Sequence, residues 1–512
     1  MNKKNQLRSG VILSYINLAI GSVIPFAYTP VMLRMLGQAE YGLYSLASSA
    51  VAYLSLLSFG FGSTIVRYIS KYRAENDRES EEKTYGFFLL LYCALAVLVL
   101  ICGIIIIMNV EPIFHRGLTK AEVDKMKMLV GIMTFNTMLS FPLSVFSSMI
   151  IAHEKYIFQK LTNMIATVLA PIANLIALYL GYKAVGMAIA GTIMQFTMIP
   201  ANIIYCYKNL NIRPKFSRIP ISLKKEMFGF SIFVFIGSIV DMLFWATDKV
   251  ILGMLESSIA VAIYNVGATF NSMIVNLSTS ISGVLTPKIT GMVVKEKKKE
   301  QFTELFIRIG RLQFIIIALI VSGFTVFGQT FIRLWAGNSY KDAYWVALMT
   351  MLPLCIPLIQ NTGLTIVVAQ NKHQFRSVVY LIIAIINVIS TYLTVPYMGI
   401  IAAALCSCIS YIVGQGIIMN LYYYKVTKID IPLFWKNILK MAVVPATMTI
   451  TGVFLVNNIY IENWRRFLFG VVIFSCVYAI FMYLFVLNDY EKNIFKNPVI
   501  KVLKKIDSKR NY

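Results

Sequence analysis

Residues 84–109 read TYGFFLLLYCALAVLVLICGIIIIMN, a stretch without a single charged side chain. An α-helix needs about 20 apolar residues to cross the hydrocarbon core of a bilayer, so this stretch is long enough to span a membrane. No alternating strand pattern of about ten residues appears elsewhere in the chain, and we therefore expect helices. Comparable stretches predict fourteen spans, at 11–33, 44–66, 84–109, 128–151, 158–180, 184–206, 228–252, 258–287, 309–331, 345–369, 378–398, 400–424, 437–457 and 467–487.

The composition of the 512-residue chain agrees with this interpretation. Hydrophobic residues make up 58% of the chain and charged residues 14%, whereas soluble domains contain about 45–50% and 25%. All seven cysteines fall inside or at the edge of predicted spans, so no disulfide framework is expected. We predict an all-α integral membrane protein without a soluble domain.

The basic residues are distributed unevenly between the two sides of these spans. With the N-terminus in the cytoplasm, 36 of the 47 Lys and Arg residues lie on the cytoplasmic side and 11 on the other. The positive-inside rule therefore places both termini in the cytoplasm, with 111–127 and 332–344 outside. The net charge of +24 then indicates attraction to anionic membrane lipids, and no nucleic-acid partner is expected.

Four pairs of matching segments indicate an internal duplication. Their separation stays between 213 and 221 residues, and each copy contains six spans. An even number of spans gives two parallel repeats, so we predict an N-lobe at 1–210 and a C-lobe at 211–425 around a central cavity. Residues 426–512 then add two C-terminal helices and a basic tail. The matching segments are 31–36 with 250–255, 62–67 with 283–288, 152–155 with 369–372, and 174–180 with 387–393.

No catalytic or metal-binding constellation is apparent in the sequence. The three histidines, His115, His153 and His373, have no Cys or carboxylate grouping at metal-ligand spacing. There is no Walker A sequence and no complete dinucleotide fingerprint. We expect neither an enzyme nor a bound cofactor or metal.

Polar and ionisable residues inside spans are the candidate site residues, because such groups are costly in lipid and normally face a partner or a wet cavity. Asp241, Asp248 and Lys249 lie in the seventh span, and Asn265 and Asn276 share one face of the eighth. A cavity-lining role is expected for Asp241, with an interhelical hydrogen bond as the alternative. Asp248 and Lys249 have a second interpretation, an interfacial ion pair that never meets substrate.

Arg67 and Lys288 occupy matched repeat positions at the cytoplasmic ends of the second and eighth spans. Each residue alone is explained by ordinary positive-inside charge. Their recurrence at one repeat position instead favours a basic inner mouth of the cavity. Such a mouth suits a pyrophosphate head group, since Arg and Lys are the usual partners of phosphate.

Six segments carry a family resemblance: 36–44, 66–68, 152–159, 247–253, 262–264 and 327–337. Together they resemble the polysaccharide repeat-unit (Wzx-type) flippases of the multidrug/oligosaccharidyl-lipid/polysaccharide exporter superfamily. The resemblance implies two six-helix lobes, a cationic cavity and alternating access. It also implies transport of an undecaprenyl-pyrophosphate-linked oligosaccharide from the inner to the outer leaflet, with a glycan polymerase and glycosyltransferases as candidate partners. A total of fourteen spans, rather than twelve, is similar to the lipid II and sporulation-type branches of this superfamily.

Two other functions are compatible with the sequence. A cation-coupled multidrug exporter of the same superfamily often relies on carboxylates embedded in the first lobe, and the first six spans contain none. A non-transporting scaffold for glycan assembly would be expected to carry soluble docking domains, which the chain lacks.

Overall fold

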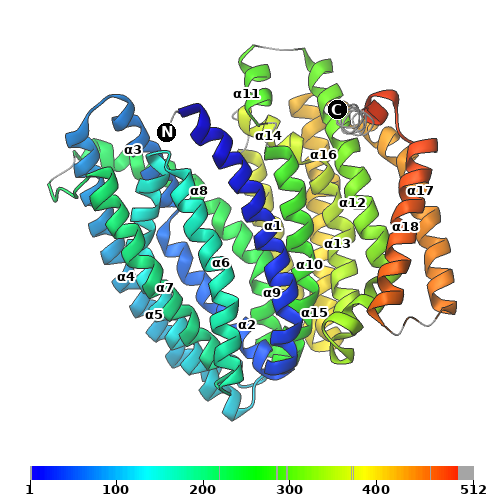
Figure 1. The fold of residues 1–512 in the computed structure, drawn as a ribbon, viewed down its shortest axis with the longest axis horizontal. Helices are drawn as coiled ribbons and strands as arrows, with labels where there is room; N and C mark the ends of the chain where they lie inside the picture. The colour runs from blue at the N-terminus through cyan, green and yellow to red at the C-terminus, as the bar shows by residue number, and fades with distance from the viewer. Residues whose placement is uncertain are drawn as a thin grey trace, which may run out of the picture. The chain divides into compact units, whose positions relative to one another are not determined.

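The computed structural model describes residues 3–217, 220–283, 286–295, 298–370, 372, 374–459, 461 and 463–493, and every regular element in these residues is a helix (Figure 1). Within them, twelve helices are long and apolar enough to cross a membrane, and thirteen when the bent pair α13 (Ala343–Ile359) and α14 (Asn361–Ala369) counts as one span. The all-α membrane class is therefore confirmed, whereas the number of fourteen spans stays a prediction.

A glycine interrupts the longest of these helical segments, which covers residues 374–427 and contains α15 (Gln374–Tyr411). Gly399 has a φ of 56°, in the left-handed region that glycine enters without a steric penalty. This break lies between the predicted eleventh and twelfth spans, 378–398 and 400–424.

The chain divides into two compact units. Unit 1 comprises residues 1–265 and 380–403, and unit 2 comprises residues 266–379 and 404–512. The lobe boundary at residue 210 stays a prediction; in unit 1, α8 packs against α3, and α9 against α2. The elements of unit 1 are α1 (Lys3–Leu36), α2 (Gln38–Ala52), η1 (Tyr53–Ser58), α3 (Phe61–Ala74), α4 (Arg78–Phe114), α5 (Lys120–Ala152), α6 (Tyr156–Tyr179), α7 (Lys183–Tyr205), η2 (Cys206–Leu210), α8 (Ile221–Trp245), α9 (Thr247–Leu255), the start of α10 (Ser258–Gly283) and the middle of α15.

Local sequence signals set where the long helices of unit 1 begin. Asp77 precedes α4, and its side chain accepts a hydrogen bond of 3.0 Å from the backbone N–H of Ser80. Thr119 and Glu122 form a complete capping box at the start of α5. Both arrangements satisfy N–H groups that have no partner within the helix. They fix the ends of α4 and α5, which pack together along their length.

Unit 2 is built around α12 (Lys299–Trp335), which packs against α13, α17 (Ile431–Asn458) and α18 (Trp464–Phe485). Arg311 on α12 is buried, and its Nε and one terminal nitrogen lie 2.6 and 2.8 Å from the two carboxylate oxygens of Glu491. This two-point ion pair attaches the chain that follows α18 to α12. The other elements of unit 2 are the end of α10, α11 (Thr286–Val294), η3 (Asn338–Tyr340), α14, the two ends of α15, η4 (Ile412–Ile418), α16 (Met419–Tyr422) and η5 (Tyr423–Thr427).

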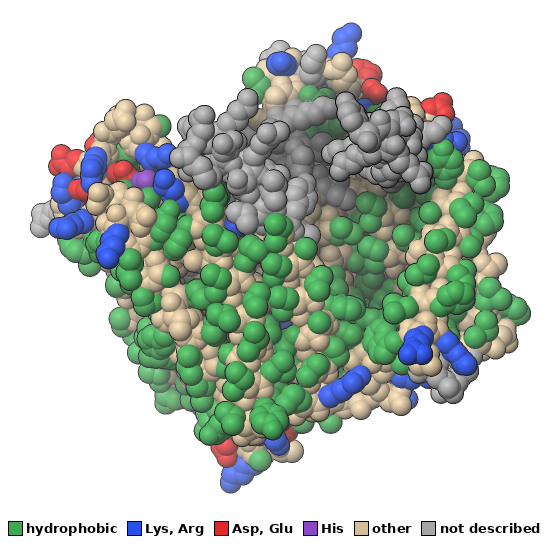
Figure 2. Space-filling model, viewed as in Figure 1, with side chains coloured by type: hydrophobic (Ala, Val, Ile, Leu, Met, Phe, Trp, Pro, Cys, Tyr) green, Lys and Arg blue, Asp and Glu red, His purple; other side chains and the backbone are tan. Residues whose placement is uncertain are grey.

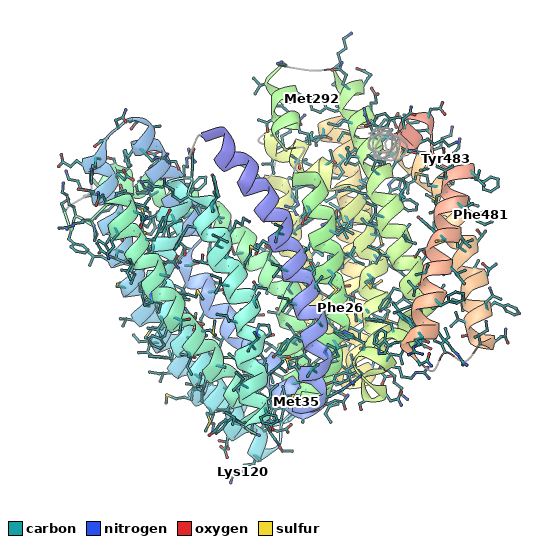
Figure 3. The ribbon with its side chains drawn as sticks, viewed as in Figure 1. Phe26, Met35, Lys120, Met292, Phe481 and Tyr483 are labelled. Atoms are coloured by element: carbon teal, nitrogen blue, oxygen red, sulfur yellow. The ribbon has the colours of Figure 1, made fainter. Side chains whose placement is uncertain are left out.

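Large apolar side chains point outward from the helices of both units. On the face shown in Figure 2, hydrophobic side chains cover the lengths of the helices and most charged side chains gather near helix ends. Phe26 on α1 is 37% exposed and Phe481 on α18 is 44% exposed, and both are labelled in Figure 3. Because a soluble protein rarely exposes apolar surface on this scale, these faces are suited to contact with lipid.

Candidate functional site

Three of the predicted site residues meet in one polar cluster of unit 1. The Nζ of Lys249, on α9, donates a hydrogen bond of 3.3 Å to the side-chain oxygen of Asn265, on α10. The side-chain NH₂ of Asn265 in turn donates to the hydroxyls of Tyr41 and Ser45, on α2, at 2.6 and 3.1 Å. We call these residues, together with Asp248 and Tyr264, the α9 cluster.

Asp248 supplies the negative charge of the α9 cluster. Its side chain is 2% exposed and accepts a hydrogen bond from the Tyr264 hydroxyl. It lies in the first turn of α9, where the partial positive charge of a helix N-terminus favours a carboxylate. An isolated charge in such a place is strongly unfavourable. The Tyr264 hydroxyl and the adjacent Lys249 therefore make a buried Asp248 tolerable.

A second contact joins α9 to the segment after α2. The hydroxyls of Tyr53, in η1, and Thr247, the first residue of α9, are 2.5 Å apart. The α9 cluster and this contact together connect α2, η1, α9 and α10 through side-chain hydrogen bonds. A movement of α9 away from α2 would break several of these bonds at once.

Two glycines allow these helices to approach closely enough for the bonds to form. A Cβ added to Gly42, on α2, would lie 1.8 Å from the carbonyl oxygen of Ser258. A Cβ added to Gly253, on α9, would lie 2.5 Å from a methyl group of Leu46. Both glycines belong to segments that carry the flippase resemblance, 36–44 and 247–253. The structure therefore gives both motifs a packing role, one against the start of α10 and the other against α2.

The other predicted residues lie outside the α9 cluster. Arg67 is exposed on α3, with its guanidinium carbon 4.6 Å from the ring centroid of Phe230, a cation–π contact to α8. Asp241 is exposed on α8. Asn276 is exposed on the part of α10 that belongs to unit 2. Lys288 falls in α11, and its side chain lies outside the described residues.

The comparison with known families shows the family to which the chain belongs. A family model described as "Polysaccharide biosynthesis protein" matches residues 7–293, which include every residue of the α9 cluster. The chain belongs to the polysaccharide biosynthesis protein family. A curated relative, the "Uncharacterized membrane protein EpsK" of Bacillus subtilis (strain 168), is 21% identical over 484 residues, covering 91% of this chain and 92% of the relative.

Solved structures show which fold this family member has. A structure titled "Lipid II flippase MurJ, inward closed conformation" superposes with a TM-score of 0.71 at 17% identity, covering 96% of this chain and 99% of that one. An inward-facing multidrug resistance MATE family transporter of the MOP superfamily superposes with a TM-score of 0.64 at 13% identity, covering 82% and 99%. These two likenesses show the fold of the chain, and the resemblance to polysaccharide proteins inferred from the sequence is confirmed by the family match.

Sequence reasoning identified the charged residues of the α9 cluster but missed its hydroxyl groups. Tyr41, Ser45 and Tyr264 were not predicted, because hydroxyls are common in membrane helices and stand out less than charges. One signal was present: Tyr41 and Tyr264 lie inside segments that carry the flippase resemblance. Asp248–Tyr264 and Lys249–Asn265 are each separated by 16 residues, a spacing that becomes informative only when the turn after α9 is known.

The side chains of the α9 cluster are suited to binding. The α9 cluster contains one ammonium group, one carboxylate, an amide and several hydroxyls, without an activated nucleophile beside a base. No group of three or more His, Cys, Asp or Glu side chains that could hold a metal occurs in the described part of the chain. An ammonium surrounded by hydrogen-bonding side chains is suited to an anionic group such as a phosphate.

Proposed function

We propose that this chain moves a lipid-linked oligosaccharide from the inner to the outer leaflet of a bacterial cytoplasmic membrane by alternating access. The observation that carries the proposal is the family match over residues 7–293, because it connects polysaccharide biosynthesis with a chain made of membrane-spanning helices. The fold shared with a lipid II flippase supports a lipid-linked cargo. Undecaprenyl pyrophosphate is the proposed carrier, with a polymerase and glycosyltransferases as partners.

In this mechanism the basic residues act at two stages. Arg67 and Lys288 attract the pyrophosphate at the inner mouth, and Lys249 binds it deeper in unit 1. In the present structure the ammonium group of Lys249 donates a hydrogen bond to the side-chain amide of Asn265. To bind cargo, Lys249 must break this bond and form one with the phosphate as α9 moves. Cargo shifts a carrier between states only through a difference in affinity, and such an exchange supplies one.

The leaflet in which the lipid-linked oligosaccharide accumulates tests this proposal. Depletion of the protein in cells is expected to raise the total amount of lipid-linked oligosaccharide and to confine it to the inner leaflet. A membrane-impermeant enzyme that cleaves the glycan, applied to intact spheroplasts and to lysed membranes, measures both quantities. Unchanged access from outside would contradict flipping.

The same measurement separates the two alternatives. A scaffold for glycan assembly predicts that depletion lowers the total amount of lipid-linked oligosaccharide, because assembly fails before transport. A multidrug exporter predicts normal glycan in both leaflets and increased sensitivity to cationic drugs. Either result would contradict the proposed function and favour the corresponding alternative.

The proposed orientation has both termini in the cytoplasm and residues 332–344 outside. Single cysteines in place of Asn338 and Lys297 are expected to differ in a background in which the seven native cysteines are replaced. A membrane-impermeant maleimide should label position 338 in intact cells, and position 297 only after lysis. Labelling of position 297 in intact cells would reverse the orientation.

Arg67→Ala and Lys288→Ala are expected to reduce export, because each removes a charge from the inner mouth. Charge-assisted hydrogen bonds contribute about 1.5–3 kcal/mol, so each variant should lose roughly tenfold or more in export rate at equal protein level. Arg67→Lys should retain more activity than Arg67→Ala. The control is Lys71→Ala, which removes an exposed lysine from the same helix. Normal export by both alanine variants would mean that Arg67 and Lys288 only orient the chain in the membrane.

A further inference from the structure

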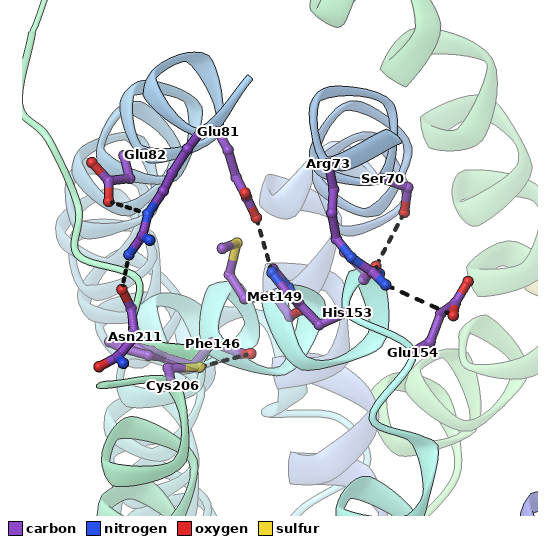
Figure 4. Close-up of polar contacts among 12 residues, drawn as sticks. Ser70, Arg73, Glu81, Glu82, Phe146, Met149, His153, Glu154, Cys206 and Asn211 are labelled. Carbon is purple, nitrogen blue, oxygen red and sulfur yellow. Dashed lines mark hydrogen bonds and ion pairs between the residues drawn. The ribbon is translucent and has the colours of Figure 1, made fainter. Parts of the chain in front are cut away.

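A histidine and a glutamate meet at one end of unit 1, away from the α9 cluster. His153 directly follows α5, and Glu81 lies in the first turn and a half of α4 (Figure 4). The Nε2 of His153 is 3.0 Å from the Oε1 of Glu81, and the two side chains are 11% and 7% exposed. Both are therefore nearly shielded from water.

The contact of the other ring nitrogen, Nδ1, determines which nitrogen of His153 carries a hydrogen. Its Nδ1 lies 2.9 Å from the backbone carbonyl oxygen of Met149. A carbonyl oxygen only accepts hydrogen bonds, so Nδ1 must carry a hydrogen. Nε2 is then the position that gains or loses a proton, and it faces the Glu81 carboxylate.

The two helix ends favour the charged form of this pair. His153 lies at the C-terminus of α5, where the partial negative charge of the helix stabilises an imidazolium. Glu81 lies near the N-terminus of α4, where the opposite partial charge stabilises a carboxylate. A proton on Nε2 also converts the contact into a charge-assisted hydrogen bond.

Removal of that proton reverses the interaction. A neutral His153 with its hydrogen on Nδ1 presents a lone pair at Nε2, and the Glu81 carboxylate presents another at 3.0 Å. Two buried acceptors facing each other have no hydrogen bond to offset their lost hydration. The contact must then separate or take up another proton.

We propose that His153 and Glu81 form a proton-binding site whose single shared proton joins the end of α5 to the start of α4, and whose loss opens that junction. The proposal does not depend on which cargo the protein carries.

The charged groups around this pair have partners of their own. From α3, Arg73 donates to the Ala152 carbonyl oxygen at 2.6 Å and lies 3.8 Å from Glu154. From α4, Glu82 lies 3.3 Å from Arg78 and 2.9 Å from Lys215, which belongs to the segment after η2.

Two of the neighbouring groups keep their charge while a histidine titrates. The hydrogen bond to Glu82 raises the pKa of Lys215 above its ordinary value. The hydrogen bonds from Ser80 lower the pKa of Asp77, the residue that caps α4. Neither Lys215 nor Asp77 therefore contributes a change of charge near neutral pH at this end of unit 1.

The predicted repeat offers an internal comparison. Both α4 and α12 contain 37 residues, and aligning their first residues places Phe302 opposite Glu81. The matched segments 152–155 and 369–372 place Gln370 opposite His153. Neither counterpart titrates, so the repeated scaffold does not need this pair in order to form. The proton-binding site is then a property of the first copy alone.

The test follows the protonation of one histidine in the full-length protein. His115→Gln with His373→Gln leaves His153 as the only histidine, and ¹⁵N-labelled histidine in nanodiscs reports both ring nitrogens by NMR between about pH 5 and 9. His115 in the otherwise native protein is the reference. Its Nδ1 also contacts a carbonyl oxygen, that of Pro112 at 2.8 Å, but the side chain is exposed.

The expected result is that His153 keeps both ring nitrogens protonated at a pH at which His115 has become neutral. Glu81→Gln should abolish this difference, whereas Glu82→Gln should leave it in place, because Glu82 pairs with Arg78 and Lys215. Hydrogen exchange of peptides 78–83 and 149–155 should rise about tenfold when His153 loses its proton.

Two results would overturn the proposal. One is a His153 that titrates together with His115 in the presence of Glu81. The other is a junction whose exchange, corrected for intrinsic pH effects, does not change when the proton is lost. Size-exclusion profiles of the Gln variants establish that they are folded, so neither result can be attributed to unfolding.

Discussion

Replacement of Gly42 by leucine is expected to leave little or no folded protein. A Cβ at this position would lie 1.8 Å from the Ser258 carbonyl oxygen and 2.6 Å from its carbonyl carbon. These are backbone atoms, so they cannot move aside as the end of a flexible side chain can. Overpacking of this kind costs about 1–3 kcal/mol even for small additions, and Gly42→Ala should already lower the melting temperature by several degrees.

Gly21 provides the matched control for Gly42. It lies in the helical interior of α1, is exposed, and has no atom within 4 Å of an added Cβ. Gly21→Ala should therefore be neutral or slightly stabilising, since alanine is favoured over glycine in helices by about 1 kcal/mol. Thermal unfolding followed by size exclusion compares the two variants. A Gly42→Ala protein as stable as Gly21→Ala would show that α2 and the start of α10 are not in close contact.

The variant Lys249→Met is expected to fold and to export poorly. Methionine keeps the length and apolar stem of the lysine but removes the ammonium group that the proposed pyrophosphate would bind. Removal of one partner from a buried pair of charges is destabilising, by about 3–5 kcal/mol when the remaining charge is left alone. Asp248 keeps the hydrogen bond from the Tyr264 hydroxyl, so the variant should be less stable than the native protein but still fold. Loss of a charge-assisted hydrogen bond of about 1.5–3 kcal/mol should lower export roughly 10- to 100-fold. The leaflet assay measures this loss, and thermal unfolding measures stability.

Since Asp248 remains buried in that variant, the double variant Asp248→Asn/Lys249→Met separates charge balance from cargo binding. If Lys249 only neutralises Asp248, the double variant should recover export; if Lys249 binds cargo, it should not. Lys120→Met is the surface control, because Lys120 is exposed at the start of α5 (Figure 3). Full export by Lys249→Met would instead support the second interpretation, in which Asp248 and Lys249 form an interfacial ion pair that never meets substrate.

The sequence was sufficient to predict the class of fold because a bilayer requires long apolar helices, and these are visible in any window of about twenty residues. It was less informative about where helices are broken. The predicted seventh span, 228–252, is divided in the structure at Ala246 into α8 and α9. Nothing in its apolar pattern distinguishes a break from a continuous helix, because both bury the same side chains.

Contacts between distant residues set the limit on predicting the site. The sequence identified Lys249 and Asn265 because a charge or amide in a span is rare, yet Tyr41 lies 224 residues before Asn265. His153 was assessed only for metal-ligand spacing. Its partner Glu81 precedes it by 72 residues, and the packing of α4 on α5 alone brings the two together.

The ion pair between Arg311 and Glu491 has a consequence for how the protein is made. The two residues are 180 positions apart, and ribosomes add roughly 5–20 residues per second. Arg311 therefore enters the membrane about ten to forty seconds before its carboxylate is synthesised. During that interval its guanidinium lacks the carboxylate partner, and we expect it to stay in contact with water, as long basic side chains do at membrane boundaries. Docking of the chain after α18 is thus a late step in the assembly of unit 2.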